Sequence, residues 1–366
     1  RRAVFTDVMD VIERKIAAGE YMLSDLPGER RLAEEVGVSY MTARKAVLRL
    51  IDKEVLSRKP NGSLTVHPRL HGDVKQHRIA LLSPAYPAAH LVRLRLEVTR
   101  WAMKDGLQFR AFEYIHWDDA IVRQAVDGCD GLVVIPSTEA IPERLLGSFS
   151  AAGSKVLCLD GDMTDHGIPS IRLFSREHIR ALFDHLRSLG HRRISCLNTQ
   201  GRNAEIEARI GQWRAWLTEN DATGALWDDP APPFEDPMAR ARDAMHGILA
   251  AADGPLGAIV CTTQPAAVGA MRACYDRGVV VGRDVSICTI NNEPTGEFFC
   301  PSLTGLEMPD IEPLLERCYG WFTAENDNPF TGELLITPAQ PALLRGESTG
   351  NAPDAVSLTA NDHQAV

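Results

Sequence analysis

The sequence predicts an α/β protein in which a small helical unit with a β-hairpin precedes a larger unit of two lobes built on parallel sheets. Two observations support this prediction. Residues 26–66 contain two short amphipathic helical patterns, a tight turn and a hairpin pattern. From residue 78 onward, short apolar runs alternate with amphipathic helical patterns, which is typical of sheets covered by helices on both faces.

Three helices are predicted in the small unit. The first covers residues 3–18, where apolar residues recur on one face. The second begins after Pro27, whose fixed φ suits a first helical turn, and ends at Gly37, which tolerates a left-handed cap. Ser39 is a good N-cap for the third. Its apolar stripe has the spacing i, i+3, i+4 and i+7 and consists of Ala43, Ala46, Val47 and Leu50.

A β-hairpin follows, with strands at residues 55–58 and 63–66 around a turn at 59–62 that contains Asn-Gly. A helix-turn-helix followed by a hairpin is a winged helix-turn-helix, which binds DNA. Arg44, Lys45 and Arg49 lie off the apolar stripe, so that the outward side of the third helix is basic and suits a major groove. The alternative is an ordinary amphipathic helix pair with a charged outer face.

This segment resembles the DNA-binding domain of the GntR family of bacterial transcription regulators over residues 3–68. The resemblance is carried by Leu26-Pro27, Glu29-Arg30, Leu32-Ala33, Gly37-Val38-Ser39, Thr42, Arg44, Ala46, Leu50, Leu56, Arg58 and Gly62. It implies contacts with bases or phosphates from the start of the third helix and a wing tip in the minor groove. With the basic outer face, the candidate DNA-binding residues are Arg30, Ser39, Tyr40, Thr42, Arg44, Lys45, Arg49 and Gly62.

Two positions depart from the family pattern. Tyr40 stands where the family usually has Arg, which removes a candidate for a bidentate guanine contact, so we expect a different operator half-site. Glu54 stands where glycine is common in the family, so the family pattern does not determine the conformation of the turn before the wing.

The chain has a net charge of −10, but the charge is uneven: residues 1–70 hold 13 Lys/Arg against 10 Asp/Glu, and the remainder holds 26 against 39. A weakly basic N-terminal part on an acidic remainder fits DNA binding at one end. No apolar run is long enough to span a membrane, and the N-terminus lacks a signal-peptide pattern. The eight cysteines form no C-x-x-C pair, so we expect reduced core thiols in a cytoplasmic protein without a metal or other cofactor.

The predicted domain organisation is a winged helix-turn-helix at residues 1–68, a polar linker at 69–77, a two-lobed effector-binding domain at 78–346 and a disordered tail at 347–366. The boundary between the lobes is expected near residues 160–170, with the run 170–173 opening the second lobe. Ligands of open α/β sheets bind beyond the carboxyl ends of the strands, so the space between the lobes is the expected binding site.

Residues 78–346 resemble the effector domain of the LacI family, a two-lobed periplasmic-binding-protein-like (type 1) fold. The resemblance is carried by the runs at residues 130–136, 186–194 and 282–287, above all Leu186-Arg187-Ser188-Leu189-Gly190-His191-Arg192. It implies a carbohydrate-like effector, with Arg209 as the arginine that holds it. The candidate effector-binding residues, from the resemblance and from positions at strand ends, are Tyr86, Ser137, Asp160, Arg209, Trp213, Gln264 and Asn291.

Phe174, Gln264 and Asn291 stand where the family often has Asp. Gln and Asn can both donate and accept hydrogen bonds, so we expect a less anionic pocket than usual. With Arg209 unopposed, a sugar acid, a phosphorylated sugar or an oligosaccharide becomes a candidate effector.

No nucleophile–base motif, P-loop or metalloprotease motif occurs, so no catalytic or metal-binding residues are predicted and we expect no enzyme. The sequence predicts a homodimeric repressor that binds a palindromic DNA operator and responds to a small carbohydrate-like effector. The alternatives are an activator of the same architecture and a solute-binding component of a transport system, which would need an export signal in place of the DNA-binding unit.

Overall fold

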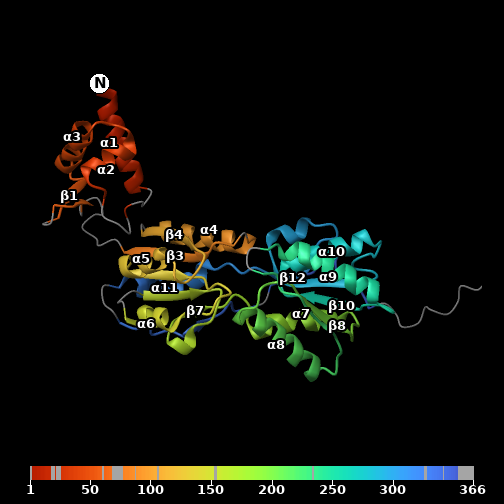
Figure 1. Ribbon diagram of the computed structural model, residues 1–366. Helices are drawn as coiled ribbons and strands as arrows, with labels where there is room; N and C mark the ends of the chain where they lie inside the picture. The colour runs from red at the N-terminus through yellow and green to blue at the C-terminus, as the bar shows by residue number, and fades with distance from the viewer. Residues whose placement is uncertain are drawn as a thin grey trace, which may run out of the picture.

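The computed structural model describes residues 2–17, 21, 26–59, 62–67, 77–86, 88–104, 107–151, 155–232, 235–324, 328–340 and 342–352. We call residues 2–67 the head and residues 77–352 the body. Figure 1 shows the head at one end of a body that has two lobes side by side. Of the predicted linker, only His77 is described, and residues 353–366 of the predicted tail also lie outside the described residues.

The head is a winged helix-turn-helix, as the sequence predicts. Its elements are α1 (Arg2–Ala17), α2 (Glu29–Val36), α3 (Tyr40–Asp52), β1 (Leu56–Arg58) and β2 (Leu64–Val66). Gly37 ends α2 in the left-handed region, at φ 69°, and the Ser39 hydroxyl accepts a hydrogen bond from the backbone N–H of Thr42 at 3.2 Å. Both predicted caps are therefore confirmed. The antiparallel wing strands bury Leu56 and Leu64 against the helices.

The N-terminal lobe of the body is a parallel sheet between two helical layers. Its strands run in the order β13-β7-β6-β5-β3-β4. Their bounds are β3 (Arg78–Pro84), β4 (Gln108–Tyr114), β5 (Gly131–Val134), β6 (Lys155–Leu159), β7 (Ser170–Ile171) and β13 (Leu335–Ile336). One face packs on α4 (Ala89–Lys104) and α11 (Glu312–Thr323), and the other on α5 (Ala120–Gly128) and α6 (Glu143–Ala151). A 3-10 turn, η2 (Thr164–His166), follows β6.

The C-terminal lobe has the same three-layer plan, with strand order β14-β12-β11-β10-β8-β9. Its strands are β8 (Ile194–Asn198), β9 (Leu226–Asp228), β10 (Ala258–Cys261), β11 (Ser286–Asn292), β12 (Thr304–Glu307) and β14 (Leu343–Leu344). Among the described strands of this lobe, β14 alone is antiparallel to its neighbour. The helices are α7 (Arg176–Ser188) and α8 (Ala204–Glu219) on one face, and α9 (Pro237–Ala251) and α10 (Gln264–Asp276) on the other. A 3-10 turn, η3 (Pro294–Phe298), follows β11.

The boundary between the lobes differs from the prediction. The run at 170–173 was expected to open the second lobe, but β7 pairs with β6 and β13 inside the N-terminal sheet. The chain crosses between lobes at 172–175, again at 308–311, and a third time between β13 and β14. A strand of two residues is too short for its sequence to show which sheet it joins, because that depends on pairing with strands far away in the chain.

The predicted tail is also corrected in part, because residues 347–352 pack on the C-terminal lobe. Ser348 is fully buried, its hydroxyl donates to the Ile287 carbonyl at 2.6 Å, and the Ile287 N–H donates to the Ser348 carbonyl at 2.9 Å. The small polar residues of this segment predict an unstructured tail, but in the structure they form hydrogen bonds with the start of β11. Among the described residues, no helix is long and apolar enough to cross a membrane.

Candidate functional site

A cavity of about 1070 Å³ lies between the two lobes of the body. Its wall is formed where strands of both sheets end, at residues that follow β3, β5 and β6 of the N-terminal lobe and β8, β10 and β11 of the C-terminal lobe. This is the position at which open α/β sheets bind ligands. The volume is at the upper end of that of small-molecule sites.

Six of the seven candidate effector residues lie in the cavity wall: Tyr86, Ser137, Asp160, Arg209, Gln264 and Asn291. Trp213 does not, and its assignment is corrected. The Trp213 indole N–H donates to the carbonyl of Ile194 at 2.9 Å, and the ring packs in the core. Ile194 begins β8, whereas the cavity lies at the opposite end of that strand, so Trp213 is too deep in the lobe to reach a ligand.

Arg209 is held in the wall by contacts with its own lobe and with the segment in which the chain crosses between the lobes. Its Nη1 donates to the carbonyl of Thr262 at 2.7 Å, and its guanidinium carbon lies 5.5 Å from the centre of the Phe174 ring. Its Nε is buried and has no hydrogen-bond partner among the described residues. Burial lowers the pKa of Arg209, while the nearby Asp160 and Glu205 carboxylates act in the opposite direction. The free Nε is a donor for a ligand oxygen.

Gln264 and Asn291 form a second fixed polar group. The backbone N–H of Gln264 donates to the Asn291 side-chain oxygen at 3.0 Å, and the Gln264 amide donates to Asn292 Oδ1 at 3.1 Å. Asn291 therefore holds the start of α10 as well as lining the cavity. The neighbouring Thr263 hydroxyl also lies in the wall, buried and without a partner among the described residues.

The expectation of an unopposed Arg209 is wrong, because Asp160 and Glu205 act on its guanidinium, and the cavity wall as a whole contains more acidic than basic residues. Its carboxylates outnumber its arginines by five to two: Asp160, Glu205, Glu235, Asp236 and Glu293 against Arg202 and Arg209. Burial raises the pKa of Asp160, and Arg209 partly offsets this effect. Glu205, Glu235 and Glu293 form ion pairs with Arg172, Arg240 and Arg93, which do not line the cavity, so the acidic excess that faces a ligand is smaller than this count.

Two arginines each bridge one carboxylate of either lobe. Arg172 contacts Asp162 at 3.0 Å and Glu205 at 3.2 Å. Arg93 of α4 contacts Glu97 at 2.7 Å within its own helix and Glu293 of the C-terminal lobe at 3.8 Å. These ion pairs are partly buried, so removing one partner leaves a charge that is only partly exposed to solvent and destabilises the protein.

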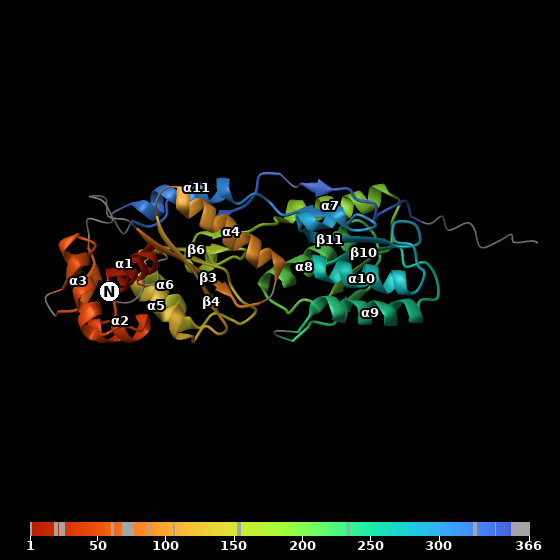
Figure 2. The same cartoon turned by 90° about the horizontal axis from the view of Figure 1, so that it is seen from above.

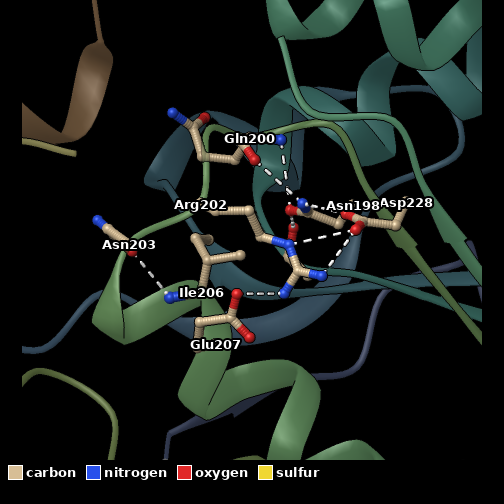
Figure 3. A network of polar contacts seen from close by, with 8 residues as sticks. Asn198, Gln200, Arg202, Asn203, Ile206, Glu207 and Asp228 are labelled. Carbon is tan, nitrogen blue, oxygen red and sulfur yellow. Dashed lines mark hydrogen bonds and ion pairs between the residues drawn. The ribbon is translucent and has the colours of Figure 1, made fainter. Parts of the chain in front are cut away.

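A polar network fixes the loop between β8 and α8 at the cavity wall (Figure 3). Asn198 donates to Asp228 at 2.9 Å and to the Gln200 carbonyl at 3.0 Å. Arg202 contacts Asp228 at 2.7 Å and Glu207 at 2.5 Å. Gln200 and Arg202 line the cavity, whereas Asn198 does not. Asn198 holds Gln200 directly and Arg202 through their shared partner Asp228.

Sequence reasoning missed six titratable residues of the wall: His90, Arg202, Glu205, Glu235, Asp236 and Glu293. Burial lowers the pKa of His90 to about 4, with a smaller contribution from Arg209, so the imidazole is neutral at pH 7. Glu205 lies at the start of the predicted helix after β8, and Glu293 directly follows the predicted strand β11. Their places after strand ends were the sequence signal that could have identified them as cavity residues.

On the head, the basic side chains of α3 face outward. Arg44, Lys45 and Arg49 are exposed, as are Arg30 and Ser39, whereas Thr42 is half-buried. Tyr40 is 38% exposed. Gly62 is at φ 85°, and its carbonyl accepts a hydrogen bond from Arg58 at 3.1 Å. The candidate residues on α3 thus share its solvent-facing side or its N-terminal end.

Comparisons with known proteins show which protein families the head and the body resemble. A family model described as "Bacterial regulatory proteins, gntR family" matches residues 6–66, and one described as "Periplasmic binding protein-like domain" matches residues 183–311. Both resemblances inferred from the sequence are confirmed. The HTH-type transcriptional regulator reg1 of Streptomyces lividans is 25% identical over 251 residues, which cover 64% of this chain and 69% of that protein.

Solved structures share the fold. A structure of the Lac repressor bound to ONPG has a TM-score of 0.63 and 20% sequence identity, covering 87% of this chain and 98% of the other. A LacI family transcriptional regulator from Arthrobacter sp. FB24 in complex with lactose has a TM-score of 0.62 and 17% identity, covering 75% of this chain and 100% of the other. At these identities the likeness is one of fold.

Proposed function

We infer that this chain, which joins a GntR-type winged helix to a periplasmic-binding-protein-like domain, is a DNA-binding transcription regulator. We propose that it is a repressor controlled by a carbohydrate-like effector. The observation that carries the proposal is the combination of a basic recognition helix on the head with a polar cavity between the lobes of the body.

The DNA interface we propose is the outward side of α3 together with the wing. Exposed Arg44, Lys45 and Arg49 lie along one helix, opposite the buried stripe of Ala43, Ala46, Val47 and Leu50. In a major groove, such a helix reads base edges with its first turns and contacts phosphates with the remainder. Gly62 at the wing tip has no Cβ to prevent close approach to a backbone.

The effector we propose is an uncharged polyhydroxylated molecule. Hydroxyl groups can accept from the unpartnered Nε of Arg209 and donate to the carboxylates of the wall. Tyr86 and Phe299 supply ring faces on which a sugar can pack. A carboxylate or phosphate on the ligand would meet an excess of negative charge.

We propose that the functional unit is a homodimer on a palindromic operator, since one winged helix reads few base pairs. Support comes from the outer face of α4, where Val92, Leu96 and Met103 are 46%, 57% and 71% exposed. These residues lie at helical spacing on one stripe, as expected of a surface that a second copy covers. Effector binding would close the cavity, move α4 at this surface and change the spacing of the two heads.

A gel-shift assay with DNA from upstream of the gene tests the function. We expect wild-type protein to shift this DNA and a neutral sugar to weaken the shift. Arg44→Ala should lower DNA affinity by roughly tenfold or more at unchanged thermal stability, because an exposed base-contacting arginine contributes about 1–3 kcal/mol. Arg14→Ala, at an exposed position of α1, is the control and should bind as wild type. A sequence-independent shift by the wild type would contradict the proposal.

A further inference from the structure

Arg93 ties three separate segments together at the lobe boundary. Its Nε donates to Glu97 of the same helix at 2.7 Å, and its Nη2 donates to the carbonyl of Met308, where the chain crosses between lobes, at 3.2 Å. Its Nη1 lies 3.8 Å from Oε2 of Glu293, at the end of β11 in the C-terminal lobe. Figures 1 and 2 both place one end of α4 next to the C-terminal lobe.

Glu293 is placed between this arginine and the cavity. It is 6% exposed and lines the cavity wall, and its second oxygen, Oε1, is buried without a hydrogen-bond partner among the described residues. An unpaired buried carboxylate oxygen is costly unless a ligand or another donor satisfies it. Glu293 can therefore respond to the contents of the cavity while it holds Arg93.

We propose that the Arg93–Glu293 pair is a latch between the lobes, which favours the closed cavity and lowers the affinity for operator DNA. The same helix that carries Arg93 inward carries Val92 and Leu96 outward, on the surface proposed for the second copy. A change at the latch is thus transmitted by a rigid helix to the dimer surface. The regulatory part of this inference rests on the proposed function; the latch itself does not.

Arg93 contacts two carboxylates, Glu293 in the latch and Glu97 on its own helix. A Glu→Gln substitution at Glu97 therefore serves as a matched control for the same substitution at Glu293. Arg93 Nη1 lies 3.8 Å from Glu293 Oε2, beyond the ordinary hydrogen-bond distance, so this contact depends on the two opposite charges and is weakened in Glu293→Gln. Glu97 accepts a hydrogen bond from Arg93, and the amide oxygen of Glu97→Gln can still accept it. Glu97 does not line the cavity.

The latch is tested in the full-length protein without any effector. Spin labels at Gln124→Cys on α5 and Tyr275→Cys on α10, both exposed and in different lobes, report the interlobe distance in a Cys300→Ser background. Labelled protein is diluted with unlabelled protein, so that intramolecular distances dominate. We expect Glu293→Gln and Arg93→Gln to add a longer-distance population, and Glu97→Gln to match the wild type. Unchanged distributions in folded Glu293→Gln and Arg93→Gln would overturn the latch.

A gel shift without sugar tests the regulatory part. Because the latch favours the closed form, Glu293→Gln should bind operator about threefold or more tightly than wild type, and Glu97→Gln should not. Lobes that open without a change in operator affinity would refute regulation through the latch. If the wild type binds no DNA, the proposed function fails, and the distance measurement still decides the latch.

Discussion

The hydroxyl of Tyr40, at the start of the recognition helix, donates a hydrogen bond to the carboxylate of Glu29 at 3.1 Å. The same carboxylate forms an ion pair with Arg58 of the wing. Glu29 begins α2, so that one acidic side chain connects α2, α3 and the hairpin. The residue that departs from the GntR pattern therefore has a structural partner, and its hydroxyl is already used within the head.

This contact predicts the behaviour of Tyr40→Phe. The substitution removes the hydroxyl and keeps the ring, so we expect the head to lose about 0.5–1.5 kcal/mol of stability while selecting the same DNA sequences. Thermal unfolding of the protein and selection from a random DNA pool provide the two measurements. A different selected sequence would mean that the Tyr40 hydroxyl contacts a base. Tyr40→Ala, which also removes the ring, separates the contribution of the hydroxyl from that of the ring.

A second prediction concerns Glu54, which precedes the wing at φ 57°. A non-glycine residue in this left-handed region costs about 1–2 kcal/mol of stability. Glycine removes this cost, but it loses about 0.5–1 kcal/mol more backbone entropy on folding. We expect Glu54→Gly to stabilise the head by about 0.5–1 kcal/mol, measured by denaturant unfolding. The reciprocal control is Gly37→Ala, at φ 69°, which should be destabilising. A loss of stability in Glu54→Gly would show that the interactions of the Glu54 side chain outweigh the relief of backbone strain.

The elements that could be predicted are those whose cause is local. The turn at Gly37 and the cap at Ser39 follow from single residues, and the cavity residues Tyr86 and Ser137 follow from their places after recognised strands. Trp213 was misplaced because it shares a buried helix face with Arg209 but lies one turn farther from the cavity. Helical spacing identifies the face and gives no depth along the helix axis.

The remainder depends on contacts between distant parts of the chain. Arg93 and Glu293 are far apart in sequence, and neither has a pattern that marks it as more than a surface charge. The acidic character of the cavity likewise arises from five carboxylates on separate segments. These carboxylates come together only when the lobes are assembled. The sequence alone therefore could not show that an acidic effector is a poor fit.

A third prediction tests the proposed dimer surface. Leu96→Glu places a carboxylate in the middle of the exposed apolar stripe on α4, so that burying this surface against a second copy would bury two unpaired charges. We expect monomers by size-exclusion chromatography with light scattering, and loss of the operator shift. Gln124→Glu, an exposed position on α5 of the same lobe, adds the same charge and should remain dimeric. A dimeric Leu96→Glu protein would place the interface elsewhere.

The last prediction concerns the C-terminal segment, where two truncations differ only in whether residues 347–352 remain. Ser348 exchanges hydrogen bonds with Ile287, and the Gly350 carbonyl lies 3.0 Å from His191 Nε2, a ring nitrogen placed to donate to it. Removing residues 347–366 leaves these buried groups unsatisfied, so we expect a loss of about 3–5 kcal/mol from several hydrogen bonds of about 1 kcal/mol each. Removing only residues 353–366 should leave the thermal unfolding of the body unchanged. Equal stability of the two truncated proteins would mean that the segment contributes nothing to the C-terminal sheet.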